Sequence, residues 1–216
     1  MPLTPVEDTI LMNDLATIFL VDPDPMMQQS IAELADALQV TAEFFDRAET
    51  LLQTPLNSRR GCVVSEFRLH GMNGIALQEA LAHNHCHLPI LFVSKHPETH
   101  LIVKAIKSNA VTVLDKPFSR QDLWDALTEA LQLNEQVRRL DSQHELIRKR
   151  FSCLTAKERE VMKMIAAGKP NKVVANQLAV SVRTIESRRH QVFKKTGANS
   201  VAELVKLIVQ AGELED

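Results

Sequence analysis

The sequence predicts an α/β domain built on a five-stranded parallel sheet, then a long helix, then a small all-α domain of four helices. Three observations lead to this expectation. In the first half, five short apolar runs alternate with amphipathic segments, one uninterrupted helical pattern follows, and four shorter helical patterns complete the 216 residues. Alternating strand and helix signals are typical of a doubly wound sheet, which carries helices on both faces. The length is comfortable for two domains.

The five apolar runs are the expected strands of the first domain, which we place at residues 16–120. They are ATIFLV (16–21), VTAEFF (40–45), CVVSEF (62–67), LPILFVS (88–94) and VTVLD (111–115). A segment with helical spacing follows each run, as at Ile31, Leu34 and Leu38. In such a sheet the functional residues gather at the carboxyl ends of the strands. Residues 1–15 are expected to form a flexible tail.

A long helical linker is expected at residues 121–150. Ser119 and Asp122 form an N-cap signal, and neither glycine nor proline interrupts the pattern until past Arg150. Positions spaced alternately by four and three form a short heptad stripe: Leu133, Val137, Leu140, His144, Ile147 and Phe151. Two interpretations are open, because the stripe can pack on the chain's own domains or pair with its counterpart in a dimer.

Four helices are expected in the last domain, at residues 151–212. We expect them to run from a Thr155–Glu158 capping box to Gly168, from an Asn171 cap to near Leu178, from Ser181 to Thr196, and from Val201 to Ala211. Residues 213–216 are expected to form an acidic tail.

Charge separates the two ends of the chain. Residues 1–120 carry 9 Lys and Arg against 14 Asp and Glu, which gives −5, and residues 121–150 carry 5 against 6, which gives −1. Residues 151–216 carry 11 against 7, which gives +4. The basic end therefore has the electrostatics to approach phosphate.

Cellular location can also be predicted from the sequence. No run approaches the roughly 18 apolar residues of a membrane span, and the amino terminus lacks the pattern of a secretory signal. Cys62, Cys86 and Cys153 are scattered, which favours reduced thiols. We expect a cytoplasmic protein with no membrane partner.

The third helix of the last domain, VRTIESRRHQVFKK, combines a narrow apolar stripe with many polar and basic residues. A short helix, a tight turn and a basic helix match a helix-turn-helix, whose second helix enters the major groove of DNA. A basic helix face is often only solvated, so charge alone does not decide the matter.

The residue pattern of the last domain is more specific than its charge. The LT..E.EV opening, the G..NK..A..L turn and the S.RT.E....V..K ending closely resemble the DNA-binding domain of the LuxR/FixJ (NarL) family of bacterial regulators. The resemblance implies a transcription regulator that binds double-stranded DNA. It places Glu186, Ser187 and His190 at base edges. The implied phosphate contacts are Lys172, Thr184, Arg188, Arg189, Lys194 and Lys195.

The first domain resembles the receiver domain of two-component response regulators, which has a CheY/flavodoxin-like fold. That resemblance implies transfer of a phosphoryl group from a histidine kinase to an aspartate that ends strand three, with Mg²⁺, a lysine and a hydroxyl stabilising the charge. Lys116 with its Pro117 neighbour matches the family's lysine, Ser94 stands in the place of the hydroxyl, and Asp22 matches one of two metal-binding acids.

Other positions depart from the family pattern. The acceptor position is Glu66, the second acid is replaced by Pro23 with Asp24 following, and the aromatic switch falls on Val113. We therefore expect a degenerate receiver that is not phosphorylated in the usual way, with no cofactor and with Mg²⁺ binding in doubt. Glu66 has two interpretations. It can reach Lys116 and Ser94 and mimic the phosphorylated form, or it can keep a structural ion pair with Lys116 in a docking module.

The sequence thus predicts a sequence-specific DNA-binding transcription regulator of response-regulator type, and not an enzyme. We expect a homodimer through the receiver surface of helix four, strand five and helix five and through the linker helix. RNA polymerase is a further partner that the family suggests, and the action of a cognate histidine kinase stays open.

The alternatives are a conventional regulator that accepts phosphate, a sensor of acyl-homoserine lactones, and a receiver that serves only protein interactions. One tryptophan and no tyrosine argue against the lactone sensor, which binds its ligand among aromatic side chains. His83, His85, Cys86 and His87 lie close in sequence, but their spacing is not that of a structural metal site, and no metal is expected.

Overall fold

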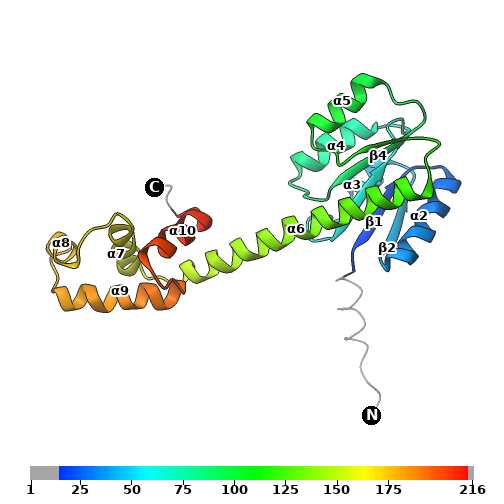
Figure 1. Ribbon diagram of the computed structural model, residues 1–216. Coiled ribbons are helices and arrows are strands. Elements are labelled where there is room, and N and C mark those ends of the chain that lie inside the picture. The colour runs from blue at the N-terminus through cyan, green and yellow to red at the C-terminus, as the bar shows by residue number, and fades with distance from the viewer. Residues whose placement is uncertain (1–14, 214–216) are drawn as a thin grey trace, which may run out of the picture. The chain divides into compact units, whose positions relative to one another are not determined.

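The computed structural model describes residues 15–213, and the chain divides into two compact units, residues 1–137 and 138–216 (Figure 1). The long helix α6 (Arg120–Ser152) contributes its first part to the first unit and its last part to the second. Apart from Leu15 and Glu213, the two predicted tails lie outside the described residues. No helix within residues 15–213 is long and apolar enough to span a bilayer.

The first unit contains one parallel sheet of five strands in the order β2-β1-β3-β4-β5. The strands are β1 (Thr17–Val21), β2 (Thr41–Phe45), β3 (Gly61–Ser65), β4 (Ile90–Ser94) and β5 (Val113–Asp115). All five fall on the predicted apolar runs. Because the order reverses between β1 and β3, their carboxyl ends border the crevice where such sheets carry their sites.

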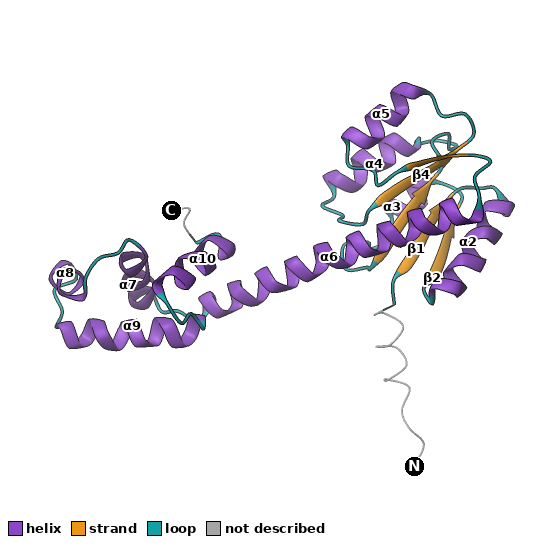
Figure 2. Ribbon diagram, in the orientation of Figure 1, coloured by secondary structure: helices purple, strands orange, loops and turns teal. Residues whose placement is uncertain are grey.

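Helices cover both faces of this sheet (Figure 2). Side chains of α2 (Pro25–Leu38) and the first part of α6 pack with Leu20, Val64 and Leu91 on one face. On the other face, α3 (Ala48–Leu52), α4 (Gly74–His83) and α5 (Thr99–Lys107) pack with Phe19, Val63 and Phe92. Strands β1, β3 and β4 are buried along their whole length, as expected for parallel strands covered on both sides.

The second unit is all helical. After the end of α6 it contains α7 (Ala156–Ala166), α8 (Asn171–Gln177), α9 (Val182–Thr196) and α10 (Val201–Ala211). These helices share one apolar core, in which Phe151 of α6, Val174 of α8 and Val192 of α9 are fully buried. The four-helix prediction is therefore confirmed.

Most predicted helix ends are also confirmed. Thr155 and Glu158 form the capping box, Ser181 caps α9, and Gly197, with a φ of 77°, ends it. The predicted Asn171 cap is wrong, because Asn171 is the first residue of α8 and Pro170 occupies the cap position without a side-chain bond. The Asn171 side chain instead accepts a hydrogen bond from Arg189 Nη1 at 3.3 Å.

The heptad stripe of α6 divides between two environments. Ile147 and Phe151 are buried in the core of the second unit, so for them packing on the chain's own domain is correct. Leu133 and Leu140 are 42% and 55% exposed, and they leave an apolar strip on the helix surface.

Candidate functional site

The residues that follow the strands of the first unit meet at the carboxyl edge of the sheet. Lys116 Nζ, after β5, lies 2.6 Å from Asp22 Oδ2, after β1, and 3.3 Å from Glu66 Oε2, after β3. Ser94 Oγ, which ends β4, donates a hydrogen bond to Glu66 Oε1. The side chains of Asp22, Lys116 and Glu66 are only 3%, 12% and 13% exposed, so water screens this cluster weakly.

Glu66 makes the contacts that its first interpretation requires. Its carboxylate reaches both Ser94 and Lys116, whereas a structural ion pair needs only the contact with Lys116. Oε1 also accepts the N–H of Phe67 at 2.8 Å, so the carboxylate is folded back toward its own loop. Both oxygens of Glu66 are therefore already bonded.

Lys116 holds the cluster together electrostatically. Burial of the ammonium works against its charge, but the hydrogen bond and charge of Asp22, and then those of Glu66, outweigh burial and raise the pKa of Lys116. The lysine is thus charged throughout the neutral range. It sits beside two carboxylates, as the family's lysine would sit beside a phosphoryl group and an acid.

Asp24 does not join this cluster. Its Oδ1 accepts the N–H of Met26 at 3.0 Å and caps α2, and its own N–H donates to Asp22 Oδ1 at 2.9 Å. The carboxylates of Asp22 and Glu66 are thus bonded to Lys116, Ser94 or backbone N–H groups. No group of three metal-ligating side chains occurs within residues 15–213.

Two cationic side chains near this cluster were not predicted from the sequence. Arg68 and Lys95 line a shallow pocket of about 520 Å³ together with Asp22, Glu66 and Lys116. Arg68 Nη2 also pairs with Glu98 Oε1 at 3.1 Å. Their position in the sequence could have indicated them, since each lies within two residues of a predicted site residue at a strand end.

The helix-turn-helix consists of α8 and α9. Ile185 and Val192 of α9 are buried against the other helices of the unit, which turns the opposite face of α9 outward. The predicted base readers Glu186, Ser187 and His190 are all exposed on α9. Among the predicted phosphate contacts, Lys172 and Lys194 are exposed, and Thr184 and Arg188 are partly buried.

The remaining two predicted phosphate contacts are engaged inside the unit. Lys195 Nζ lies 2.9 Å from Glu158 Oε1 and 2.7 Å from Oε2, and so ties α9 to the capping box of α7. The Arg189 guanidinium lies over the Phe193 ring, 5.5 Å from its centroid. Both side chains therefore have partners within the unit, which the basic pattern of α9 did not reveal.

Glu158 shows the effect of this pairing. The Lys195 hydrogen bond, with the N–H of Thr155 next, holds the pKa of the Glu158 carboxyl below its usual range. Glu158 is 8% exposed and ionised at neutral pH, so Lys195 neutralises a buried charge.

Arg183 was not predicted from the sequence. It is exposed in the first turn of α9, and its spacing from Ser187, His190 and Lys194 places all four on one face. This spacing of four, three and four residues could have indicated Arg183 from the sequence.

Comparison with known proteins identifies both units. The family model described as the response regulator receiver domain matches residues 18–128, and that of the bacterial regulatory proteins of the luxR family matches residues 152–208. The chain is 35% identical to the transcriptional regulatory protein FixJ of Bradyrhizobium diazoefficiens over 92% of this chain and 97% of that protein. It is 32% identical to nodulation protein W of the same organism, over 89% and 85%.

Solved structures agree with these matches. The response regulator StyR superposes with a TM-score of 0.82 at 33% identity, over 91% of this chain and 99% of that one. Full-length FixJ from B. japonicum gives a TM-score of 0.55 at 34% identity, over 93% and 98%. The chain therefore belongs to the LuxR/FixJ-type response regulators, which are DNA-binding transcription regulators and not enzymes.

Proposed function

We propose that this regulator binds its DNA sites as a homodimer whose receiver is held in a competent state by Glu66 and is not phosphorylated in the usual way. One observation carries the proposal. The Glu66 carboxylate contacts both the hydroxyl of Ser94 and the ammonium of Lys116, the two groups that would otherwise stabilise a phosphoryl product.

Loss of phosphorylation follows from the bonding of Glu66. An acceptor carboxylate must attack phosphorus in line while a metal ion neutralises the phosphoryl oxygens. Here Oε1 already accepts bonds from Ser94 and Phe67, and Oε2 faces Lys116. In this proposal Lys116 neutralises the Asp22 and Glu66 carboxylates, so the protein needs no metal cofactor.

On DNA, the exposed side chains of α9 divide by chemistry. Glu186, Ser187 and His190 read base edges, because they combine exposure with hydrogen-bonding groups. The phosphate contacts, to which Arg183 is added, are Lys172, Arg183, Thr184, Arg188 and Lys194. Arg189 and Lys195 are left out of the contact set, because their charged groups are engaged within the unit.

The proposed dimer uses apolar surface that the monomer leaves exposed. Val103 and Ile106 of α5 are each 47% exposed on the first unit. Leu133 and Leu140 of α6 are also exposed. A regulator of this kind acts in the cytoplasm, where bacterial DNA lies, and RNA polymerase is its proposed partner in transcription. A cognate histidine kinase is not required.

Intact-mass spectrometry tests the proposal. We incubate the full chain with acetyl phosphate and Mg²⁺, with a conventional response regulator as positive control and Glu66→Gln as matched variant. The expected result is an unchanged mass for this protein. A stoichiometric gain of one phosphoryl group that Glu66→Gln abolishes would contradict the proposal.

A further inference from the structure

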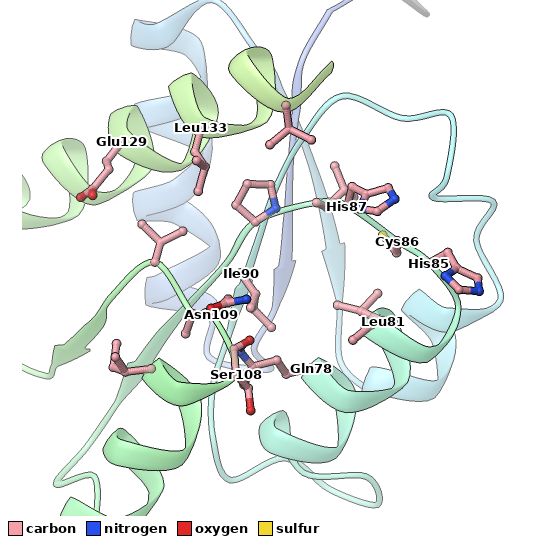
Figure 3. A pocket seen from close by; sticks show the side chains of 17 residues that line it. Gln78, Leu81, His85, Cys86, His87, Ile90, Ser108, Asn109, Glu129 and Leu133 are labelled. Carbon is pink, nitrogen blue, oxygen red and sulfur yellow. Dashed lines mark hydrogen bonds between the residues drawn. The ribbon is translucent and has the colours of Figure 1, made fainter. Parts of the chain in front are cut away.

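The last turns of the linker helix α6 belong to the second unit. At its start α6 packs on the sheet of the first unit, where Figure 3 shows its Leu133 on a pocket that Gln78 and His87 also line. At its end Phe151 is fully buried in the core that the last four helices share. Because Phe151 anchors this end of α6, the neighbouring residue Arg150 has a fixed place on the surface of the second unit, where it is exposed.

Arg150 lies at the carboxyl end of α9, the DNA-binding helix. A Cβ atom at Gly197, the residue that ends α9, would come within 3.2 Å of Arg150 Nη1 and 3.8 Å of its Cζ. The N–H of Gly197 still donates to the carbonyl oxygen of Phe193 at 2.9 Å, so Gly197 keeps the helical position that follows Thr196. The guanidinium is therefore directly beside the last turn of α9.

Gly197 continues the outward face of α9. Positions spaced alternately by four and three residues run along this face from Arg183 to Lys194, and Gly197 is the next position of the series. On a helix this spacing keeps residues on one face. The guanidinium of Arg150 thus extends the row of polar and basic groups beyond Lys194, although it comes from a different helix.

Arg150 is also an unpaired cation in the described part of the chain. Two other basic side chains of this unit are engaged, since Lys195 pairs with Glu158 and Arg159 pairs with Glu213. Neither a hydrogen bond nor an ion pair holds the Arg150 guanidinium within residues 15–213. An exposed guanidinium without a partner is available to a phosphate, which it can bind through two parallel hydrogen bonds.

The dimensions of DNA place this guanidinium at the sugar–phosphate backbone. Arg183 and Gly197 lie 14 residues apart, which corresponds to about 21 Å along a helix. The major groove is only about 12 Å wide. A helix whose first turns contact base edges therefore reaches the phosphates that border the groove with its last turn, beside which Arg150 lies.

We propose that Arg150 binds a DNA phosphate at the outer border of the site, so that the linker helix is itself part of the DNA interface. This inference rests on the DNA face proposed for α9. The contact is to the backbone of double-stranded DNA and carries no base preference. The competing role is structural, because a guanidinium can also compensate the negative carboxyl end of α9. That role affects stability and leaves the salt dependence of DNA binding unchanged.

The full chain is titrated with a DNA site selected from a random library, at several salt concentrations. Arg150→Ala should bind about three- to tenfold more weakly, and its slope of log affinity against log salt should fall by about 1. Arg150→Lys keeps the charge and should restore the slope. An unchanged slope in Arg150→Ala would overturn the proposal.

Arg148→Ala is the matched control. Arg148 is likewise exposed, but it lies two residues from Arg150 on α6 and so points away from it. We expect Arg148→Ala to keep the wild-type slope. An equal fall in both variants would attribute the effect to net charge and overturn the contact of Arg150.

Neutral methylphosphonates locate the contact, when they replace the phosphates of the selected site one at a time. The wild-type chain should lose affinity at an outer phosphate where Arg150→Ala loses nothing further, because that contact is already absent. Additive losses at every phosphate would refute the proposal.

Lys194→Ala separates this inference from the proposed function. A slope that falls in Lys194→Ala but not in Arg150→Ala would refute the Arg150 contact alone, whereas an unchanged slope in both would also remove the DNA face proposed for α9. Amide hydrogen exchange of α9 checks the fold of Arg150→Ala. Lost protection of α9 together with a wild-type slope would assign Arg150 to the structural role and overturn the proposal.

Discussion

Two adjacent lysines of α9 provide the sharpest test of how this domain is built. Lys195 neutralises Glu158, which is 8% exposed, whereas Lys194 is exposed and directed to solvent. We therefore compare Lys195→Ala with Lys194→Ala in the full chain. The first change should affect stability, and the second should affect DNA binding.

The magnitude follows from the contacts. Lys195→Ala removes two charge-assisted hydrogen bonds and leaves the Glu158 carboxylate with Thr155 as its partner. Since the Lys195 side chain is 29% exposed, solvent screens part of this energy, and we expect a loss of about 1–2 kcal/mol in the free energy of unfolding. Lys194→Ala should change it by less than about 0.5 kcal/mol.

Amide hydrogen exchange of α7 and α9 in the full chain measures this stability without the first unit contributing. DNA binding is followed in parallel as a function of salt. Lys194→Ala should reduce the slope of log affinity against log salt by about 1, as expected for one lost phosphate contact, while Lys195→Ala should keep the wild-type slope.

The pairing also predicts a pH dependence. Folding holds the pKa of Glu158 below its usual range, so its stabilising contribution is complete above about 4.3, the pKa of an unperturbed glutamate. The contribution is lost as the pH falls through the lowered pKa, and Lys195→Ala should reduce this loss. A Lys195→Ala chain with wild-type exchange rates and a reduced salt slope would refute the structural role of Lys195.

Further predictions concern single residues. Arg188→Ala should weaken binding to all DNA sequences and flatten its salt dependence, and unchanged affinity and slope would exclude it as a phosphate contact. Glu186→Gln should weaken a preference for cytosine in sites selected from random DNA, because a carboxylate accepts from cytosine N4, and an unchanged preference would count against base reading. Phe151→Ala should destabilise the second unit by about 3–5 kcal/mol in hydrogen exchange, since Phe151 is fully buried, and a loss below about 1 kcal/mol would contradict its place in the core. The raised pKa of Lys116 gives stability that is present below its usual range near 10.4 and is lost as the pH rises through the raised value. Alkaline unfolding of Lys116→Met should lack this component, and an alkaline profile like that of the wild type would refute it.

The sequence predicted the strands and helices well because each has a local signal. The strand core Phe19–Leu20–Val21 shows as a continuous apolar run, and the capping box at Thr155 shows as a threonine and a glutamate three residues apart. Asn171 failed as a cap because Pro170 takes the cap position and the Asn171 side chain bonds to Arg189 instead. That bond joins two helices and has no local signal.

The same distinction applies to the sites. Family motifs located Asp22, Ser94 and Lys116, and parallel topology brought them together at one edge of the sheet. The Glu158 partner of Lys195 and the bonding of Gln78 to the carbonyl oxygens of Ala105 and Ser108 could not be predicted, because these groups lie 37, 27 and 30 residues away along the chain.

The role of Glu66 is tested most directly by DNA binding in the absence of any phosphodonor. A DNA site selected from a random library is titrated with the wild-type chain, with Glu66→Ala, and with Glu79→Ala as a control for the loss of an exposed acid. We expect wild-type binding that acetyl phosphate does not improve, and binding at least about fivefold weaker in Glu66→Ala alone. Equal binding by the wild type and Glu66→Ala, or stronger wild-type binding with acetyl phosphate, would contradict it.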